Sequence, residues 1–370
     1  MQVRGAVVKE VGQQWSVEDM ELDEPRDNEI LVRVIASGVC HSDYHLVTGD
    51  QEQPLPLVGG HEGAGIVEAV GPGVTRVRPG DHIATAYIPG CGRCEWCARG
   101  MQYICDTGAN VANGMLLDDT ARFHLSDGSG IGAMQRLGTY ANWMVISEDQ
   151  AVKIDDDLPF DRACLVACGV TTGWGTSVNA AKVRPGDTVL IIGTGGVGMN
   201  AVQGAKLAGA ANIFAVDSEP SKHELAKSFG ATHTARTIDE ALDEIRPLTN
   251  GQGADSAIVT IGVASDEIIS SAFGAIRKEG TCVVVSVGLQ KPGLSINPFE
   301  LTVYAKTLRG ALFGNSNPTV DIPRLLKLYR SGHIKLDELV TKTYPTDGIN
   351  DAYADMLEGR NIRGVILHDH

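Results

Sequence analysis

The feature that most constrains the fold is a glycine-rich turn that directly follows a buried strand. The apolar run TVLIIG (188–193) predicts the strand, and the segment AVQGAKLAG (201–209) has the apolar spacing of a helix. Between them, Gly193, Gly195 and Gly198 form the pattern G-x-G-x-x-G. Gly193 permits a tight turn, Gly195 lets a ligand approach the backbone, and Gly198 lets the helix pack closely against the strand. This stretch therefore predicts the first strand, turn and helix of a βαβ unit.

Strands and helices continue to alternate after this turn. The runs NIFAVD (212–217), SAIVTIG (256–262) and TCVVVSVG (281–288) predict strands, and HELAKSFG (223–230) predicts a helix. Strands that alternate with helices are typical of a parallel sheet covered by helices. We therefore expect an α/β fold with a doubly wound parallel sheet in this part of the chain.

The segment before the α/β part has a different character. ILVRVIASGV (30–39) and GAGIVEAVG (63–71) are short β-branched runs bounded by turn residues, which indicates a β-rich domain. Residues 106–140 are rich in glycine and polar residues and show weak periodicity. We expect a long loop there, and long loops in compact domains are often functional.

The end of the chain returns to helices and one strand. PRLLKLYRSG (323–332) and DAYADMLEG (351–359) predict helices, and RGVILH (363–368) predicts a closing strand. We expect this tail to pack on the first domain, which makes the α/β part an insertion. The predicted domains cover residues 1–168, 169–312 and 313–370, the last of these completing the first.

The charge balance narrows the class of partner. The 370-residue chain has a net charge of −15, which argues against nucleic acid and anionic membranes as partners. Its N-terminus lacks the apolar core of a signal peptide, and no apolar run approaches the ~18 residues of a membrane span. We therefore expect a cytoplasmic protein that acts on a small molecule. Cysteines stay reduced in that compartment, which favours metal binding over disulfides.

Four of the eight cysteines lie within CGRCEWCARGMQYIC (91–105). The spacing C-x2-C-x2-C-x7-C is formed by Cys91, Cys94, Cys97 and Cys105. Four thiolates that share one ion leave no open coordination position, so we interpret residues 90–106 as a structural zinc lobe. Two alternatives stay open. One is an iron–sulfur cluster, although the fourth spacing differs from the ferredoxin pattern and no proline follows the last cysteine. The other is a set of buried free cysteines.

An acidic residue ends the strand that follows the glycine turn. Asp217 comes about 20 residues after Gly198, where dinucleotide-binding proteins place the acid that binds the adenosine ribose. The helix N-terminus behind the glycines would face the pyrophosphate. Because a carboxylate repels a 2′-phosphate, Asp217 favours NAD(H) over NADP(H).

Cys40, His61 and Cys168 are further candidates for a metal site. They lie in GVCHSDYH (38–45), in GGHEGAG (59–65) and much further along the chain. Two thiolates and one imidazole form a known catalytic zinc set that leaves one position for water or substrate. The spacing of these residues does not separate a metal site from ordinary buried or surface side chains.

Three motifs together resemble one family. GHEGAGIVEAVG (60–71), the four-cysteine lobe and GTGGVG (193–198) are similar to the zinc-dependent medium-chain alcohol dehydrogenases, and the similarity runs in order from about residue 3 to residue 368. The resemblance implies a Rossmann-type sheet inserted in a β-rich, GroES-like catalytic domain that carries a zinc lobe. It also implies an enzyme that transfers hydride between an alcohol and NAD(H).

The resemblance assigns roles around a catalytic zinc. Cys40, His61 and Cys168 would bind the zinc, Glu62 would lie beside it, and Asp43 would hydrogen-bond to His61 and fix its tautomer. Zinc acts as a Lewis acid on the alcohol oxygen, so the alcohol loses its proton near neutral pH before its hydride passes to the nicotinamide.

The same resemblance implies a proton relay and further cofactor contacts. Ser42 and His45 are similar to the family's relay, which runs from a hydroxyl beside the zinc, through the cofactor ribose, to a histidine near solvent. Without the resemblance, Ser42 is interpreted as a turn hydroxyl and His45 as an exposed side chain. The implied cofactor contacts are His41 and Arg363 at the pyrophosphate, Thr172 and Val197 at the nicotinamide, Lys222 at the ribose, and Gly193, Gly195, Gly196 and Gly198 in the glycine loop.

Within the family, the sequence is most similar to the actinobacterial nicotinoprotein, or nitrosoaniline-dependent, alcohol dehydrogenases. Residues 119–123, 122–143 and 324–344 carry this likeness. Such enzymes keep NAD(H) bound through turnover and pass electrons to an external acceptor. The resemblance therefore implies a tightly held cofactor, an external electron acceptor, and a homo-oligomer, either dimer or tetramer.

Three other functions stay open. A formaldehyde dehydrogenase dependent on glutathione would carry an arginine soon after the last structural cysteine. Residues 106–121 contain none, which leaves mycothiol as the thiol. A non-catalytic redox sensor that binds NAD(H) and zinc would lack a zinc ligand or the relay, and a zinc-free quinone reductase would lack both metal sites. The resemblance also implies that Tyr87, four residues before Cys91, lines the substrate pocket.

Overall fold

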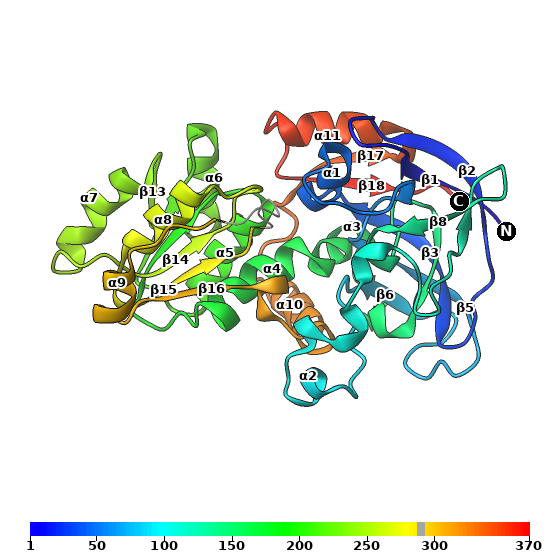
Figure 1. Cartoon of the computed structure of the whole chain (residues 1–370), viewed down its shortest axis with the longest axis horizontal. Helices are drawn as coiled ribbons and strands as arrows, with labels where there is room; N and C mark the ends of the chain where they lie inside the picture. The colour runs from blue at the N-terminus through cyan, green and yellow to red at the C-terminus, as the bar shows by residue number, and fades with distance from the viewer. Residues whose placement is uncertain (287–292) are drawn as a thin grey trace. The chain divides into compact units, whose positions relative to one another are not determined.

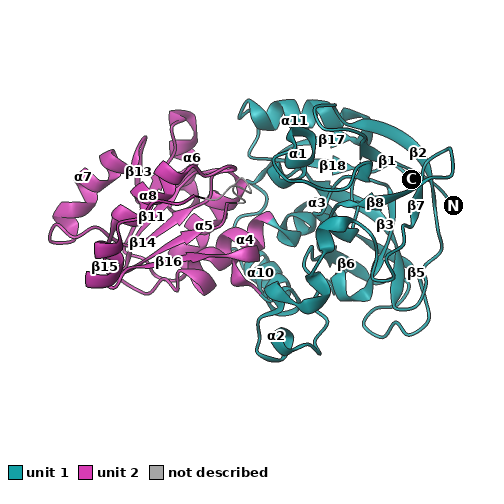
Figure 2. Ribbon diagram, viewed as in Figure 1, with its two compact units in different colours: residues 1–168, 317–370 teal, residues 169–316 magenta. Residues whose placement is uncertain are grey.

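The computed structural model describes residues 1–286 and 293–370, which divide into two compact units (Figures 1 and 2). The first unit contains residues 1–168 and 317–370, and the second contains residues 169–316. Residues 287 and 288, at the end of the predicted strand 281–288, lie outside the described residues. Among the helices of the described ranges, none has both the length and the apolar composition needed to cross a bilayer.

A six-stranded parallel sheet forms the centre of the second unit, as far as its residues are described. All five residues of its strand β11 are buried, as expected for a β-branched run inside a parallel sheet. The doubly wound parallel sheet predicted from the sequence is therefore confirmed. The strand order is β13 (His233–Ala235), β12 (Asn212–Val216), β11 (Thr188–Ile192), β14 (Ala254–Val259), β15 (Ile276–Val284) and β16 (Thr307–Gly310).

The glycine turn joins β11 to helix α5 as predicted. Gly193 has a φ of +92°, and a Cβ on Gly198 would lie only 1.9 Å from the carbonyl oxygen of Gly193. A larger side chain at either position would strain the turn or separate the helix from the strand. The helices of this unit are α4 (Gly169–Gly175), α5 (Gly196–Leu207), α6 (His223–Phe229), α7 (Ile238–Leu248), α8 (Asp266–Gly274) and α9 (Pro298–Val303).

The first unit is built from a closed barrel and a second, mostly antiparallel sheet. The barrel order is β1 (Gln2–Val8), β2 (Ser16–Leu22), β7 (Phe123–His124), β8 (Gly130–Ala133) and β4 (Leu57–Val58). The sheet order is β10 (Ala151–Lys153), β6 (His82–Thr85), β5 (Gly63–Val70), β3 (Glu29–Gly38), β18 (Arg363–Leu367) and β17 (Val340–Pro345), with β9 (Trp143–Ser147) also paired to β3. Apolar side chains of the barrel and the sheet share one core, which includes Met20, Leu22, Val32, Phe123 and Ile146.

The long loop expected at residues 106–140 is only partly a loop. It contains β7 and β8, which close the barrel, and short 3-10 helices at Asp106–Gly108, Val111–Asn113 and Met134–Arg136. The sequence pattern concealed these strands because β7 has two residues and β8 has four. So few residues cannot show a period-2 alternation.

The last part of the chain completes the first unit. Strand β18 pairs antiparallel with β3, with Val365 opposite Gly38. Helix α10 (Pro318–Arg330) begins five residues before the predicted helix, with Pro318 in its first turn and Pro323 inside it. The other helices of this unit are α1 (His41–Thr48), α2 (Glu95–Ala98), α3 (Phe160–Ala163) and α11 (Ile349–Leu357).

Candidate active site

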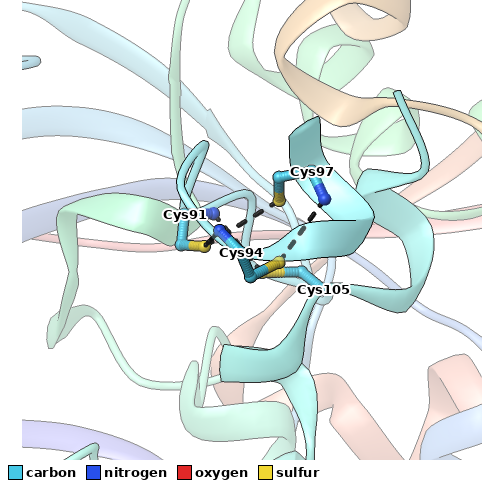
Figure 3. A group of neighbouring side chains, drawn as sticks. All are labelled: Cys91, Cys94, Cys97 and Cys105. Atoms are coloured by element: carbon cyan, nitrogen blue, oxygen red, sulfur yellow. Dashed lines mark hydrogen bonds between the residues drawn. The ribbon is translucent and has the colours of Figure 1, made fainter. Parts of the chain in front are cut away.

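The four clustered cysteines point their sulfur atoms at one another (Figure 3). Their Sγ atoms all lie within 4.8 Å of one another, with 3.9 Å between Cys91 and Cys97 and 3.8 Å between Cys94 and Cys105. Backbone N–H groups turn toward the sulfurs, as Cys97 N toward Cys94 Sγ at 3.4 Å. Burial opposes ionisation of Cys94, but such N–H donors lower its pKa to about 6. The donor set and its closeness suit a four-thiolate zinc ion.

Two arginines hold the ends of this cysteine lobe against the rest of the first unit. Arg76 donates to the carbonyl oxygens of Gly90, at 2.8 Å, and of Cys91, at 2.9 Å. Arg136 donates to the carbonyl oxygen of Thr107 at 2.8 Å. The lobe has only a small apolar core of its own, so these contacts and a bound ion would supply most of its order.

A second group of metal-ligating side chains is assembled from distant parts of the first unit. Cys40 precedes helix α1, His61 and Glu62 precede strand β5, and Cys168 ends the first stretch of the unit. One ligand atom from each of the four lies within 4.8 Å of the others. All four side chains are buried. The structure thus brings together the three residues predicted to bind the catalytic zinc.

The contact between the two thiols of this group shifts their pKa values in opposite directions. Hydrogen bonding with Cys168 lowers the pKa of Cys40 well below its usual value, and His61 acts in the same direction. The same contact raises the pKa of Cys168. A thiolate next to an imidazole and a second thiol is a donor set with strong affinity for zinc.

Asp43 orients the imidazole of His61. Its carboxylate oxygens lie 3.0 and 3.1 Å from His61 Nδ1, and Oδ1 also accepts from the backbone N–H of Gly60 at 3.0 Å. The predicted contact between Asp43 and His61 is therefore present. Because Nδ1 is occupied by the carboxylate, Nε2 is the nitrogen left to bind a metal.

Glu62 forms a buried ion pair with Arg363, whose side chain comes from β18. Burial raises the pKa of Glu62 to about 7, and Arg363 opposes that rise. Sequence reasoning placed Arg363 at the cofactor pyrophosphate and missed this pairing, because the two residues are 301 positions apart. The contact with the pyrophosphate stays a prediction.

The two predicted relay residues lie on helix α1 after Cys40. The Oγ of Ser42 is 3.6 Å from Cys40 Sγ. The side chain of His45 is buried, with 2% of its surface exposed, and its Nδ1 lies 3.0 Å from Asp50 Oδ2. A histidine without the family role was expected to be exposed, so that expectation for His45 is wrong. Its partner Asp50 is the more exposed residue of the two.

Tyr87, which was predicted to line the substrate pocket, packs edge-on against His61 with 5.6 Å between ring centroids. Sequence reasoning missed two other aromatic residues near this group, Tyr140 and Tyr353. The hydroxyl of Tyr140 donates to Asp43 Oδ2 at 3.2 Å and lies 2.8 Å from the hydroxyl of Tyr353. No motif in the sequence marks either tyrosine.

The second unit holds the acid and the glycine loop that were predicted to bind the dinucleotide. Asp217 Oδ2 accepts from the backbone N–H of Thr194 at 2.9 Å and from its hydroxyl at 2.8 Å, so the acid stands beside the glycine turn. Lys222 lies 3.4 Å from the same oxygen. Burial favours the protonated form of Asp217, but hydrogen bonds from Thr194 and Glu219 outweigh this effect and lower the pKa of Asp217.

The glycine loop leaves room for a phosphate group. A Cβ on Gly195 would meet nothing within 4 Å, and Gly195 caps the N-terminus of α5. Val197 lies in the first turn of that helix and is partly buried. Thr172 is buried in α4, and its carbonyl oxygen accepts from Thr176. His41, on the first unit, is exposed, and its contact with the cofactor stays a prediction.

Comparison with known proteins decides the family. Residues 26–156 match the model of the alcohol dehydrogenase GroES-like domain, and residues 196–331 match that of the zinc-binding dehydrogenases. An NDMA-dependent alcohol dehydrogenase from Amycolatopsis methanolica is 47% identical over 369 residues, which cover 100% of this chain and 99% of that protein.

The chain belongs to the zinc-dependent medium-chain alcohol dehydrogenases.

Two further comparisons agree with this family. The crystal structure of an alcohol dehydrogenase zinc-binding domain protein from Burkholderia ambifaria has a TM-score of 0.94 at 34% identity, with full coverage of both chains. An S-(hydroxymethyl)glutathione dehydrogenase from Paracoccus denitrificans is 35% identical over 378 residues, with 100% of both chains covered. The predicted family, its likeness to the nitrosoaniline-dependent branch, the fold and the enzyme class are confirmed. The glutathione-linked relative is clearly more distant than the alcohol dehydrogenase from Amycolatopsis.

Proposed function

We propose that this alcohol dehydrogenase reversibly oxidises a primary or secondary alcohol to the carbonyl compound, with NAD(H) as the hydride carrier. In this proposal the first unit is the catalytic domain, and the second binds the dinucleotide. The observation that carries the proposal is the closeness of the ligand atoms of Cys40, His61 and Cys168 in one buried group. A second zinc ion is assigned to the four-cysteine lobe.

The residues of the first group fit a catalytic zinc ion. Two thiol sulfurs and one imidazole nitrogen are a known catalytic donor set, and Asp43 leaves Nε2 of His61 available. Zinc held there supplies Lewis acidity to an alcohol oxygen. Glu62 is paired with Arg363, so its carboxyl group lies beside the site without being an isolated buried ion.

The residues of the glycine loop fit NAD(H). The open space at Gly195 and the N-terminus of α5 suit a pyrophosphate, and the carboxylate of Asp217 suits two ribose hydroxyls and repels a 2′-phosphate. Bound NAD⁺ supplies the hydride acceptor. Lys222 stands next to Asp217, where it would contact the same ribose.

The chain also offers groups that hold and move a proton. We assign the first step to Ser42, whose Oγ lies beside Cys40 and would take the proton of the alcohol. His45 holds a proton at Nδ1 or Nε2 and lies against Asp50, which is partly exposed. We assign the exit of the proton to His45.

The relative from Amycolatopsis is named for its dependence on NDMA. We extend that likeness to this chain and propose that NAD(H) stays bound through turnover and that an external acceptor reoxidises it. The near-ultraviolet spectrum of extensively desalted protein tests this. Absorbance of reduced nicotinamide that appears on adding an alcohol, and stays with the protein through a second desalting, supports the proposal. A desalted protein that is inactive until NAD⁺ is added supports an ordinary dehydrogenase instead.

The thiol-dependent alternative is tested in the same preparation. Formaldehyde oxidation is measured with mycothiol, with glutathione and with neither, next to the oxidation of simple alcohols. A rate that depends on one thiol and exceeds the alcohol rate would move the assignment to a formaldehyde dehydrogenase. The cytoplasmic location and the dimer or tetramer implied by the resemblance stay predictions, and light scattering of the purified protein measures the second.

A further inference from the structure

We propose that Tyr140 and Tyr353 are positioning residues for the catalytic zinc, acting through Asp43 on the imidazole of His61. The inference rests on the proposed function, because it needs a metal at Cys40, His61 and Cys168. Nothing in the sequence motifs points to either tyrosine. The contacts in the first unit carry the inference.

Asp43 needs fixed donors because its carboxylate is fully buried. Its relative exposure is 0%, and two of its donors are the imidazole of His61 and the backbone N–H of Gly60. A buried carboxylate is costly unless its oxygens are hydrogen-bonded. The hydroxyl of Tyr140 is a further donor, 3.2 Å from Oδ2. Tyr140 donates to Oδ2 and Gly60 donates to Oδ1, so both oxygens are held and the carboxylate has little freedom to turn relative to the imidazole.

The hydroxyls of the two tyrosines form a short chain that ends on Asp43. The two oxygens are 2.8 Å apart, and Tyr353 also lies 3.3 Å from the carbonyl oxygen of Cys40. Each hydroxyl has one proton to donate. A hydrogen bond to a carboxylate is stronger than one to a neutral oxygen, so Tyr140 donates to Asp43 and accepts from Tyr353. In such a chain each bond polarises the next, which strengthens the bond to the carboxylate.

Aromatic packing holds the rings in place. Trp15 stacks on Tyr353 with 5.4 Å between centroids and meets Tyr140 edge-on at the same distance. Tyr44 of helix α1 also stacks on Tyr353, at 5.6 Å. The rings are buried and enclosed, so the hydroxyls have few other positions.

This arrangement links helix α11 to the candidate metal centre. Tyr353 is carried by α11, near the end of the chain, and Asp43 is carried by α1. The tyrosines thus connect a distant helix to the hydrogen bond that sets which nitrogen of His61 faces the metal. A loss of either hydroxyl should loosen the metal ligand without changing the ligand itself.

The test compares zinc release to a chromophoric chelator from four purified holoenzymes, the wild type and three variants. Tyr140→Phe removes the donor to Asp43, and Tyr353→Phe removes the hydroxyl behind it. Tyr344→Phe is the matched control, because Tyr344 is also buried and donates to a carboxylate, Asp355, at 2.6 Å. Two zinc ions would give two phases of release. The phase that is missing in Cys168→Ser belongs to the catalytic site.

We expect catalytic zinc to leave Tyr140→Phe about 10-fold faster, Tyr353→Phe a few-fold faster, and Tyr344→Phe at the wild-type rate. Equal release rates in all four proteins would overturn the inference. It would also be overturned if Tyr344→Phe released zinc as fast as Tyr140→Phe. If Tyr140→Phe does not fold, Tyr353→Phe decides by the same comparison with Tyr344→Phe.

A double-mutant cycle tests whether the effect passes through Asp43. In an Asp43→Asn background, adding Tyr140→Phe should accelerate zinc release by clearly less than it does in the wild type. Full additivity would show that Tyr140 acts by another route and would overturn the positioning role. Failure of the proposed function looks different, because wild-type protein would then hold no zinc that depends on Cys168.

Discussion

Glu62 and Arg363 form an ion pair in which both side chains are buried, and it joins the loop before β5 to strand β18. A buried pair is weak evidence of net stabilisation, but removing Arg363 leaves Glu62 buried without its cation, and its carboxyl must then stay an unpaired charge or take up a proton. Arg363→Met should therefore lower the free energy of unfolding by about 3–5 kcal/mol. Urea unfolding of the zinc-saturated protein measures this loss.

The control for this prediction is the half-exposed pair of Arg33 and Glu68. Arg33→Met should cost at most about 1 kcal/mol, since surface pairs contribute little. Equal losses of unfolding free energy in the two variants would show that the buried pair of Glu62 and Arg363 matters no more to stability than a surface pair.

A buried histidine at the end of the chain makes stability depend on pH. Burial lowers the pKa of His368 to about 4, and its Nε2 lies 3.0 Å from the carbonyl oxygen of Thr139. The unfolded chain takes up this proton near pH 6.5, so it binds more protons than the native state between about pH 6.5 and 4. Stability should therefore fall as the pH falls through that window, by about 3 kcal/mol from this group.

His368→Gln should make the free energy of unfolding less dependent on pH between about 4 and 6.5. His333→Gln, at an exposed histidine, should leave the dependence as it is in the wild type. The prediction is wrong if the two variants show the same slope.

Asp217 sets the preference for the adenosine ribose. Asp217→Ser removes the repulsion of a 2′-phosphate and one acceptor for the ribose hydroxyls, so the ratio of kcat/KM for NAD⁺ to that for NADP⁺ should fall by about 10- to 100-fold. If the cofactor does not exchange, the readout is the nucleotide released on denaturing the purified protein, which should decrease. An unchanged ratio and unchanged nucleotide content would assign the specificity to other residues.

The four-cysteine lobe should need its metal for order. Cys94→Ser should lower the zinc content by one ion per chain, and residues 91–105 should become a site of proteolytic cleavage. Cys164→Ser, at a buried cysteine outside both groups, should leave the zinc content and the cleavage pattern unchanged. Zinc content that does not change in Cys94→Ser would contradict a metal in the lobe.

Much of the second unit could be predicted from the sequence, because its signals are local. The run before Gly193, the glycine spacing and the acid at Asp217 lie within about two supersecondary units of one another. The same holds for the cysteine lobe, whose four ligands lie within fifteen residues. In both cases the geometry follows from neighbours along the chain.

The catalytic group could be predicted only through the family resemblance. Cys40, His61 and Cys168 come from three separate segments, and no spacing rule brings them together. Asp43, which orients His61, came from the same resemblance, but three other residues around the group were missed because they also lie far away along the chain. Arg363 and Tyr353 reach the site from the end of the chain, and Tyr140 follows two strands too short to show a pattern.

Anomalous diffraction at the zinc absorption edge, from crystals of the purified protein, tests the central claim most directly. The account predicts a zinc ion about 2.3 Å from the sulfurs of Cys40 and Cys168 and about 2.0 Å from Nε2 of His61, with one position not taken by the protein. Zinc found in the cysteine lobe alone, or Cys40 and Cys168 joined as a disulfide in active enzyme, would contradict it.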